Sequence, residues 1–197
     1  DIDPGFAKRY IGGMGFGSKI LYDEVGITVD PLSPGNIVVF ANGPLTGTQA
    51  PFAGRTEVTT KSPLTGSIGT GNTGGVWGAA LKHAGFDLII VRNQAKKPLY
   101  LWIDDDVAEI RGASYLWGKN AKATTDIIRG ELETSAKSGV SVLAIGPAGE
   151  NLVRFACSLN DYHHVAGRCG AGAVMGAKKL KAIAVRGTGT VKIARPA

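Results

Sequence analysis

Short, continuous apolar segments recur along the chain and are separated by turn-forming residues. Residues 36–41 read NIVVFA, residues 87–91 read DLIIV and residues 140–145 read VSVLAI. Runs of this length, rich in Val and Ile and bounded by Gly, Pro, Asn or Asp, are typical of buried strands. The same criteria, or alternation of polar and apolar positions, predict strands at 55–61, 98–103, 107–111 and 181–185, and a further apolar run spans 153–159.

Four helices are predicted, and glycine-rich segments accompany three of them: residues 6–25, 76–84 and 174–180. The first contains GGMGFG, which lacks the GxGxxG spacing of a dinucleotide-binding turn, so its glycines are interpreted as tight packing. Residues 121–133 predict an amphipathic helix whose apolar face contains Ala123, Ile127, Ile128 and Leu132. The end of the chain, 188–197, is predicted to be a strand that runs into a linker.

Three consecutive aspartates separate the strands predicted at 98–103 and 107–111. They are Asp104, Asp105 and Asp106. Carboxylates can bind a cation, but Asp is also favoured at turns for backbone reasons. We therefore predict a hairpin with a solvated turn.

The same order of elements occurs twice. The order is a strand, a Gly-Pro turn, a loop, a glycine-rich segment, a helix and a strand ending in Arg. The first copy runs through VVFANGPLTG and GGVWGAALK to DLIIVR. The second runs through VLAIGPAGE and GAVMGAKKL to AIAVR. We predict an α+β fold with mixed or antiparallel sheets and internal pseudo-two-fold duplication, with halves at about 1–110 and 111–197. Two matching loops would suit a ligand with two similar halves, although duplication could also serve only to build a symmetric core.

Composition excludes several classes of protein. The 197 residues are 44% hydrophobic and 19% charged, with a net charge of +6 and only 7% aromatic residues. The Lys and Arg residues are dispersed apart from Lys178, Lys179 and Lys181, and few aromatics lie among them, which argues against nucleic-acid binding. No apolar run is long enough to cross a membrane. Two Cys, at 157 and 169 without CxxC spacing, predict neither a disulfide scaffold nor a metal cluster.

The chemistry of the chain is concentrated in residues 160–181, which read NDYHHVAGRCGAGAVMGAKKLK. Glycines flank Arg168, and a glycine-rich turn that leads into a helix can present N–H groups to an anion. This favours a phosphate-bearing ligand. A small-residue helix packed closely against a sheet explains the glycines equally well.

A series of ordered motifs covers nearly the whole chain: DPLSPGN, GPLTGT, AGR, TKSPLTG, GNTGG, IGPAGENLVRFA and HHVAGRCGAGAVMGAKKLKAI. Together they resemble the N-terminal domain of the aldehyde ferredoxin oxidoreductase family. The resemblance implies a tungsten or molybdenum atom held by the dithiolenes of two pterins, whose phosphates are bridged by magnesium. The domain would be the base on which this bis-pterin cofactor lies.

The resemblance also implies roles for individual residues. Arg55 would contact a pterin phosphate, and the backbone carbonyls of Asn72 and Val165 would bind magnesium. Some members have Arg in place of His164 and Ala in place of Val165, and Arg168 is the nearby guanidinium that could take over a phosphate contact. The complete expected cofactor-binding set is Arg55, Asn72, Thr73, Gly74, His164, Val165, Gly167 and Arg168.

The family's iron–sulfur ligands and proton-transfer groups resemble nothing in these residues. We therefore expect a [4Fe-4S] cluster and the catalytic groups in later domains of a longer polypeptide, and no catalytic residue here. The implied reaction is oxidation of an aldehyde to a carboxylic acid with electrons passing to ferredoxin, in the cytoplasm, by an enzyme that could be a homodimer. The alternatives are another substrate, such as reduction of an aromatic thioester, or a cofactor-free scaffold with the same fold. A nucleotide-binding domain is disfavoured because no Walker or Rossmann spacing is present.

Overall fold

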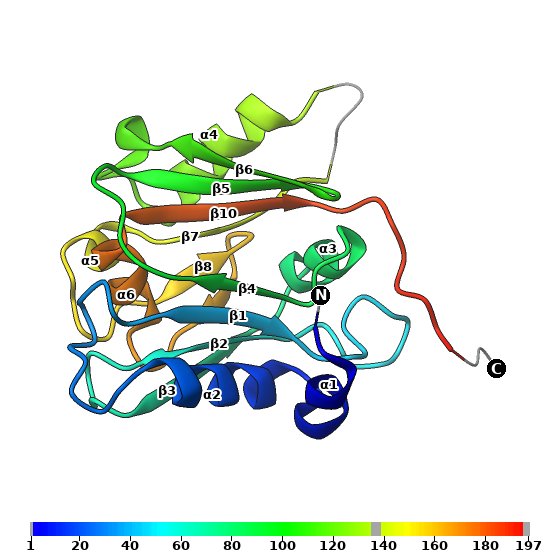
Figure 1. The fold of residues 1–197 in the computed structure, drawn as a ribbon. Helices are drawn as coiled ribbons and strands as arrows, with labels where there is room; N and C mark the ends of the chain where they lie inside the picture. Colours follow the sequence, from blue (N-terminus) through cyan, green and yellow to red (C-terminus); the bar gives the residue numbers. More distant parts are fainter. Residues whose placement is uncertain (1, 135–138, 195–197) are drawn as a thin grey trace.

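The fold consists of two β-sheets with helices between and outside them (Figure 1). The computed structural model describes residues 2–134 and 139–194. The first sheet follows two N-terminal helices, α1 (Pro4–Tyr10) and α2 (Gly13–Glu24). Its strands are β1 (Val38–Asn42), β2 (Thr56–Lys61), β3 (Ile68–Thr73) and β4 (Leu88–Val91), and α3 (Trp77–His83) precedes β4.

The second sheet has six strands in the order β6-β5-β10-β7-β8-β9. Its strands are β5 (Leu99–Asp104), β6 (Val107–Gly112), β7 (Ser141–Ala144), β8 (Ser158–Asn160), β9 (His164–Ala166) and β10 (Leu180–Arg186). Its helices are the 3-10 turn η1 (Ser114–Leu116), α4 (Ala121–Leu132), α5 (Pro147–Glu150) and α6 (Ala171–Ala177). Only β5 and β10 pair in parallel, so the sheet is mixed.

The duplication predicted from the sequence is visible in the strand order. The first sheet runs β3-β2-β1-β4, and the second contains β9-β8-β7-β10, with every pairing in both sets antiparallel. A 12-residue helix precedes each set, and a 7-residue helix precedes each last strand. The β5–β6 hairpin lies between the two copies along the chain and extends the second sheet beside β10.

The central strands of both sheets are covered on both faces. In β1, Val38 and Phe40 belong to the central core between the sheets, whereas Val39 packs toward α2. In β7, Leu143 packs into the same central core and Val142 packs toward α4. The layers are therefore α2, first sheet, α3 with α6, second sheet and α4 (Figure 1). A strand covered on both faces needs apolar residues at every position, which explains the uninterrupted runs in the sequence.

Several predicted boundaries were wrong. The helix predicted at 6–25 is divided into α1 and α2, because Ile11 and Gly12 have positive φ values of 68° and 152°. Residues 68–73 are a strand, although their glycines had been read as part of a lead into a helix. The 153–159 run contributes only its last residues to β8, and the helix predicted at 174–180 begins earlier, at Ala171. Residues 188–194 form no strand, and the rest of that predicted segment lies outside the described residues.

The buried face of α4 also differs from the prediction. Ile128 and Leu132 are buried as expected, but Thr124 and Thr125 complete the face. Their hydroxyls donate to the carbonyls of Asn120 and Ala121, both at 2.9 Å. A Thr hydroxyl that donates to a carbonyl of its own helix can be buried at little cost in free energy. A prediction based only on the spacing of apolar residues therefore misses such positions.

The local concentration of lysines is not a surface patch. Lys178 and Lys181 are 3% and 0% exposed. The Lys178 Nζ donates to the Asn36 and Asn93 carbonyls at 2.6 and 2.8 Å, and the Lys181 Nζ pairs with Glu150. The Lys178 ammonium group thus joins the end of α6 to the segments before β1 and after β4, and the Lys181 ammonium group joins β10 to α5. Among the described residues, no helix has the length and apolar character needed to cross a membrane.

Candidate cofactor-binding site

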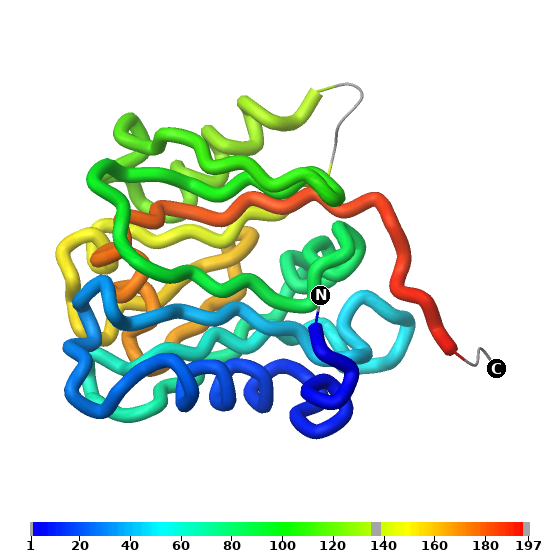
Figure 2. The backbone as a smooth tube through the Cα atoms, viewed as in Figure 1, coloured from blue at the N-terminus to red at the C-terminus, as the bar shows by residue number. Residues whose placement is uncertain are grey.

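The edge strands of the two sheets, β3 and β9, lie beside each other (Figure 2). Between them is an open hollow of about 500 Å³. Because each strand is the last of its sheet, each has one side without a ladder partner. The hollow is lined by Glu57, Thr70, Gly71, Asn72, Val165, Gly167 and Arg168. Residues from both halves of the duplication thus share one surface.

Arg55 lies at this surface from the first half. It precedes β2, and its Nη1 donates a hydrogen bond to Asn72 Oδ1 at 2.8 Å. Arg55, Asn72 and Arg168 are all exposed. A guanidinium from each half is therefore available to an anionic ligand in or beside the hollow.

The direction of the β3 carbonyls bears on the predicted magnesium site. The Thr70 carbonyl accepts a hydrogen bond from Cys169 Sγ at 3.3 Å, and the Gly74 carbonyl accepts one from Asn160 Nδ2 at 2.7 Å. Both donors belong to the second half, so both carbonyls point away from β2. Alternate carbonyls of an extended chain point the same way. The Asn72 carbonyl, between them, therefore points toward the second half.

The glycines fall into two groups. A Cβ on Gly170 would lie 1.9 Å from the Arg154 carbonyl oxygen, and on Gly176 it would lie 1.9 Å from the Gly149 oxygen. These glycines permit close packing of α6, although against α5 and the loop that contains Arg154 rather than against a sheet as the simpler interpretation proposed. Gly167 differs, because a Cβ there would meet only Val165 Cγ1 at 3.5 Å. Its backbone is open to a ligand in the hollow.

His164 contacts the glycine pair at the end of β3. A Cβ on Gly74 would lie 3.3 Å from His164 Nδ1, and a Cβ on Gly75 would lie 2.6 Å from its Cδ2. Gly75 also has a φ of 85°, a conformation that side chains rarely adopt. Thr73 is buried, and its Oγ1 lies 3.1 Å from Asn160 Nδ2. The structure therefore brings the residues of the expected cofactor-binding set around one place.

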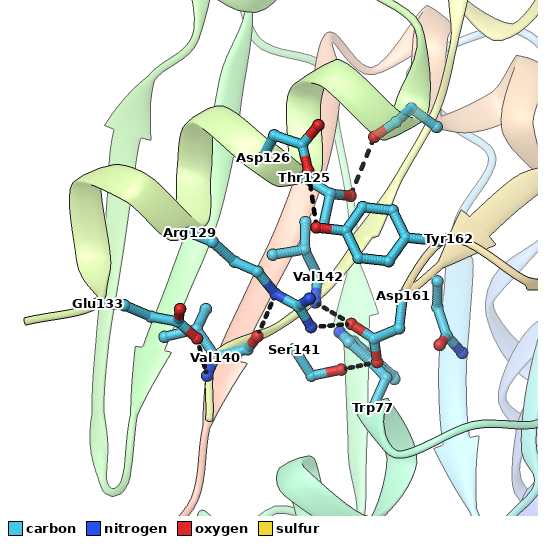
Figure 3. A network of polar contacts seen from close by, with 12 residues as sticks. Trp77, Thr125, Asp126, Arg129, Glu133, Val140, Ser141, Val142, Asp161 and Tyr162 are labelled. Carbon is cyan, nitrogen blue, oxygen red and sulfur yellow. Dashed lines mark hydrogen bonds and ion pairs between the residues drawn. The ribbon is translucent and has the colours of Figure 1, made fainter. Parts of the chain in front are cut away.

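The turn from β8 to β9 is held by the polar network in Figure 3. Asp161 Oδ1 accepts from Arg129 Nη2 at 2.7 Å and from the Val142 backbone N–H at 3.1 Å, and Ser141 Oγ donates to Asp161 Oδ2. Tyr162 donates from its hydroxyl to Asp126 at 2.7 Å. Asp161 and Tyr162 have φ values of 43° and 73°. Positive φ is unfavourable for both residue types, so the network maintains the turn that leads into His164.

Glu57 is a residue of the hollow that sequence reasoning missed. Burial raises the pKa of its carboxyl above the ordinary value, and a hydrogen bond with Thr70 partly opposes this effect. The available signal was strand alternation, because residues 55 and 57 share one face of an extended segment. Glu57 is also the cross-strand partner of Asn72. The hollow thus combines the Glu57 carboxyl group with the Arg168 guanidinium, and Arg55 lies beside it through its hydrogen bond to Asn72.

These groups fit a phosphate-bearing ligand with a divalent cation. The guanidinium groups and the open backbone at Gly167 suit phosphate oxygens, and an outward carbonyl suits a hard cation such as magnesium. Within 2–134 and 139–194, no three His, Cys, Asp or Glu side chains are grouped to hold a metal. Cys157 and Cys169 are both free thiols.

Comparison with known proteins identifies the family. Residues 1–187 match the family described as aldehyde ferredoxin oxidoreductase, N-terminal domain. The chain belongs to this family. Tungsten-containing aldehyde ferredoxin oxidoreductases of Pyrococcus furiosus and Thermococcus kodakarensis are 52% and 50% identical to it over 194 and 188 residues, which are 98% and 95% of this chain. The aliphatic sulfonate oxidoreductase, WOR-like subunit, of Pyrococcus furiosus is 38% identical over 92% of the chain.

The same fold occurs in a solved structure of a different enzyme. A solved structure of the active site complex BamBC of benzoyl coenzyme A reductase, in complex with 1,5-dienoyl-CoA, superimposes with a TM-score of 0.94 and 45% identity over 99% of this chain. The chain spans 32% of the length of the Pyrococcus furiosus aldehyde enzyme and 29% of that solved chain. Fold and family are therefore established, and the regions of the relatives that match this chain are parts of longer polypeptides.

Proposed function

We propose that residues 1–197 form the bis-pterin-binding domain of a tungsten enzyme that oxidises aldehydes to carboxylic acids and passes the electrons to ferredoxin. The observation that supports this most directly is the meeting of Asn72, Val165, Gly167 and Arg168, from both halves of the duplication, in one hollow. A ligand with two similar halves and a central cation matches such a surface. The 52% identity to a tungsten-containing aldehyde enzyme favours the same metal and reaction.

In this proposal the domain binds and orients the cofactor. Arg55 and Arg168 would neutralise phosphate oxygens of the cofactor, and the backbone carbonyls of Asn72 and Val165 would hold magnesium. Thr73 and Gly74 support the first loop, and His164 and Gly167 support the second. When bound, the bis-pterin metal centre supplies the two-electron oxidation, and the protein supplies position and charge.

The rest of the enzyme is proposed from the same relationship. The later domains of the polypeptide would supply a [4Fe-4S] cluster, the substrate pocket and the proton-transfer groups. Ferredoxin would be the electron acceptor, the enzyme could assemble as a homodimer, and an oxygen-sensitive cofactor suits the cytoplasm.

The first experiment measures metal and cofactor in the full-length protein purified without oxygen. Elemental mass spectrometry would give tungsten, molybdenum and magnesium, and fluorescence after oxidative release would give pterin. We expect one tungsten for two pterins, and aldehyde-dependent reduction of ferredoxin. Protein with neither metal nor pterin would overturn the proposal and favour a scaffold.

Reduction of an aromatic thioester is the second candidate function. It is favoured by the 45% identity and TM-score of 0.94 to the benzoyl coenzyme A reductase complex. Assays of the same full-length preparation separate the two. Aldehyde oxidation without ring reduction of benzoyl coenzyme A supports the first candidate, and the converse supports the second.

A further inference from the structure

Among the described residues, Asn160 of the second half has a side-chain amide that hydrogen-bonds to two successive residues at the end of β3, in the first half. Its Nδ2 contacts Thr73 Oγ1 at 3.1 Å and donates to the Gly74 carbonyl at 2.7 Å. The side chain comes from β8, in the second half, and the residue is 0% exposed. Thr73 and Gly74 are the two residues that follow Asn72, whose carbonyl is a proposed magnesium ligand.

The backbone of Asn160 is fixed just as firmly within the second half. It pairs with Leu143 of β7 and with His164 of β9, one residue from Val165. The following residue, Asp161, is held by Arg129, Ser141 and Val142 (Figure 3). The backbone that carries the Asn160 side chain therefore cannot shift without breaking this network. Because Asn160 pairs with β9 and hydrogen-bonds to Thr73 and Gly74, it holds the end of β3 in a fixed position relative to β9.

We infer that Asn160 is a positioning residue that sets the separation between the backbone carbonyls of Asn72 and Val165. The inference rests on the proposed function, because it assigns Asn160 a role in holding the bridging magnesium. The Cys169–Thr70 hydrogen bond also joins the two halves, but it reaches β3 before Asn72, whereas Asn160 holds the two residues that follow Asn72. A hard cation with near-octahedral geometry tolerates little variation in the distance between its ligands.

The details of the Asn160 environment match this role. The Asn160 Oδ1 is buried without a hydrogen-bond partner in the described part of the chain. A Cβ on Gly75 would lie 2.8 Å from that oxygen. The side chain is thus held close against the first-half loop at the expense of one unsatisfied acceptor, and the two N–H groups of its amide can serve both Thr73 and Gly74.

A matched control exists in the first half. Asn42 is also buried, accepts from Thr56 Oγ1 at 2.7 Å and donates to the Gly78 carbonyl at 3.0 Å. Its partners all belong to its own half. An Asn42→Ala change therefore removes a comparable pair of buried hydrogen bonds without freeing one half from the other.

The test compares full-length wild type with Asn160→Asp, Asn160→Ala, Thr73→Val and Asn42→Ala. Magnesium and tungsten are measured after timed exposure to a chelator, alongside thermal unfolding. We expect Asn160→Asp, which keeps the shape but loses both donors, to lose magnesium on the order of tenfold faster, as supporting residues of metal sites typically do. Added Mg²⁺ should slow that loss. Asn42→Ala should lower the unfolding temperature and retain magnesium like wild type.

The outcomes distinguish the positioning role of Asn160 from the proposed function of the domain. Equal magnesium retention in wild type and all Asn160 variants overturns the positioning role and leaves the proposed function intact. Equal loss in Asn160→Ala and Asn42→Ala shows a general effect of stability and also overturns it. Wild type without tungsten, pterin and magnesium overturns both proposals together. If Asn160→Ala fails to fold, Asn160→Asp and the milder Thr73→Val decide the question.

Discussion

Arg55 donates a hydrogen bond from Nη1 to Asn72 Oδ1 at 2.8 Å. The contact joins the residue proposed to bind a phosphate to the residue proposed to offer its carbonyl to magnesium. It also restrains a long, exposed side chain that would otherwise sample many rotamers. A charge that is already oriented loses less conformational entropy when a ligand binds.

Arg55 is expected to matter for cofactor retention and little for folding. Arg55→Ala should weaken retention of the tungsten cofactor by about tenfold or more, since a hydrogen bond to a charged group contributes about 1.5–3 kcal/mol. Arg111→Ala is the control, because Arg111 forms an exposed pair with Glu109 at 2.6 Å. Both changes should alter unfolding free energy by less than about 1 kcal/mol. Tungsten retained equally in both variants would contradict the role of Arg55.

Two glycines should respond oppositely to the same substitution. Gly75 has a φ of 85° and would place a Cβ 2.6 Å from His164 Cδ2, so Gly75→Ala should destabilise the protein by about 1–3 kcal/mol. Gly130 lies within α4 with nothing within 4 Å of a Cβ. Gly130→Ala should stabilise by about 0.5–1 kcal/mol through helix propensity. Thermal and urea unfolding measure both, and a shift of the same sign in the two variants would refute this reasoning.

The Asp161 network should be among the most sensitive polar features of the second half. Asp161 is 11% exposed and Arg129 is 25% exposed in their side chains. Asp161→Ala leaves Arg129 Nη2 and the Val142 N–H without their acceptor, although Arg129 Nε keeps its bond to the Val140 carbonyl, and it should cost about 2–4 kcal/mol of unfolding free energy. Lys122→Ala, which breaks an exposed pair with Asp126, should cost less than about 0.5 kcal/mol. Similar costs for the two changes in urea unfolding would show that the network is not structurally important.

Lys178 should make stability depend on pH. Burial lowers the pKa of its ammonium group from 10.5 to about 8. Between these values the unfolded chain binds a proton that the folded chain has released, so the unfolding free energy contributed by this group rises with pH, by at most about 1.4 kcal/mol per unit. Compared with Lys178→Met, wild type should therefore gain stability from about pH 8 to about pH 10. A difference that stays constant over this range in urea unfolding would contradict the prediction.

The sequence predicted the fold class because the strands are covered on both faces. Residues 36–41 and 140–145 are apolar at successive positions, and this pattern alone located β1 and β7. β3 was missed because it contains Gly69 and Gly71, which disfavour strands locally. A Cβ on Gly69 would lie 2.5 Å from Cys169 Cβ. Glycine is needed at this position because the second half packs directly against β3. Such a contact between distant segments cannot be predicted from neighbouring residues in the sequence.

The site could be predicted as a set of residues but not as a geometry. The motifs containing Arg55, Asn72, His164 and Gly167 are recognisable in the sequence, and the fold places them around one hollow. Their roles and the boundary near residue 110 stay predictions. Glu57 and Asn160 escaped notice because their importance comes from strand pairing and from contacts across the two sheets.

The parallel pairing of β5 with β10 has a consequence for the order in which the two sheets can form during synthesis. β10 pairs residue 180 with residue 99, whereas all strands of the first sheet lie between residues 38 and 91. As the chain leaves the ribosome, the first sheet is complete while the second still lacks its central strand. Contacts that join distant segments form slowly and leave edges exposed meanwhile. We therefore expect the first sheet to form before β10 emerges. The hollow between β3 and β9 should then be the last part of the domain to form.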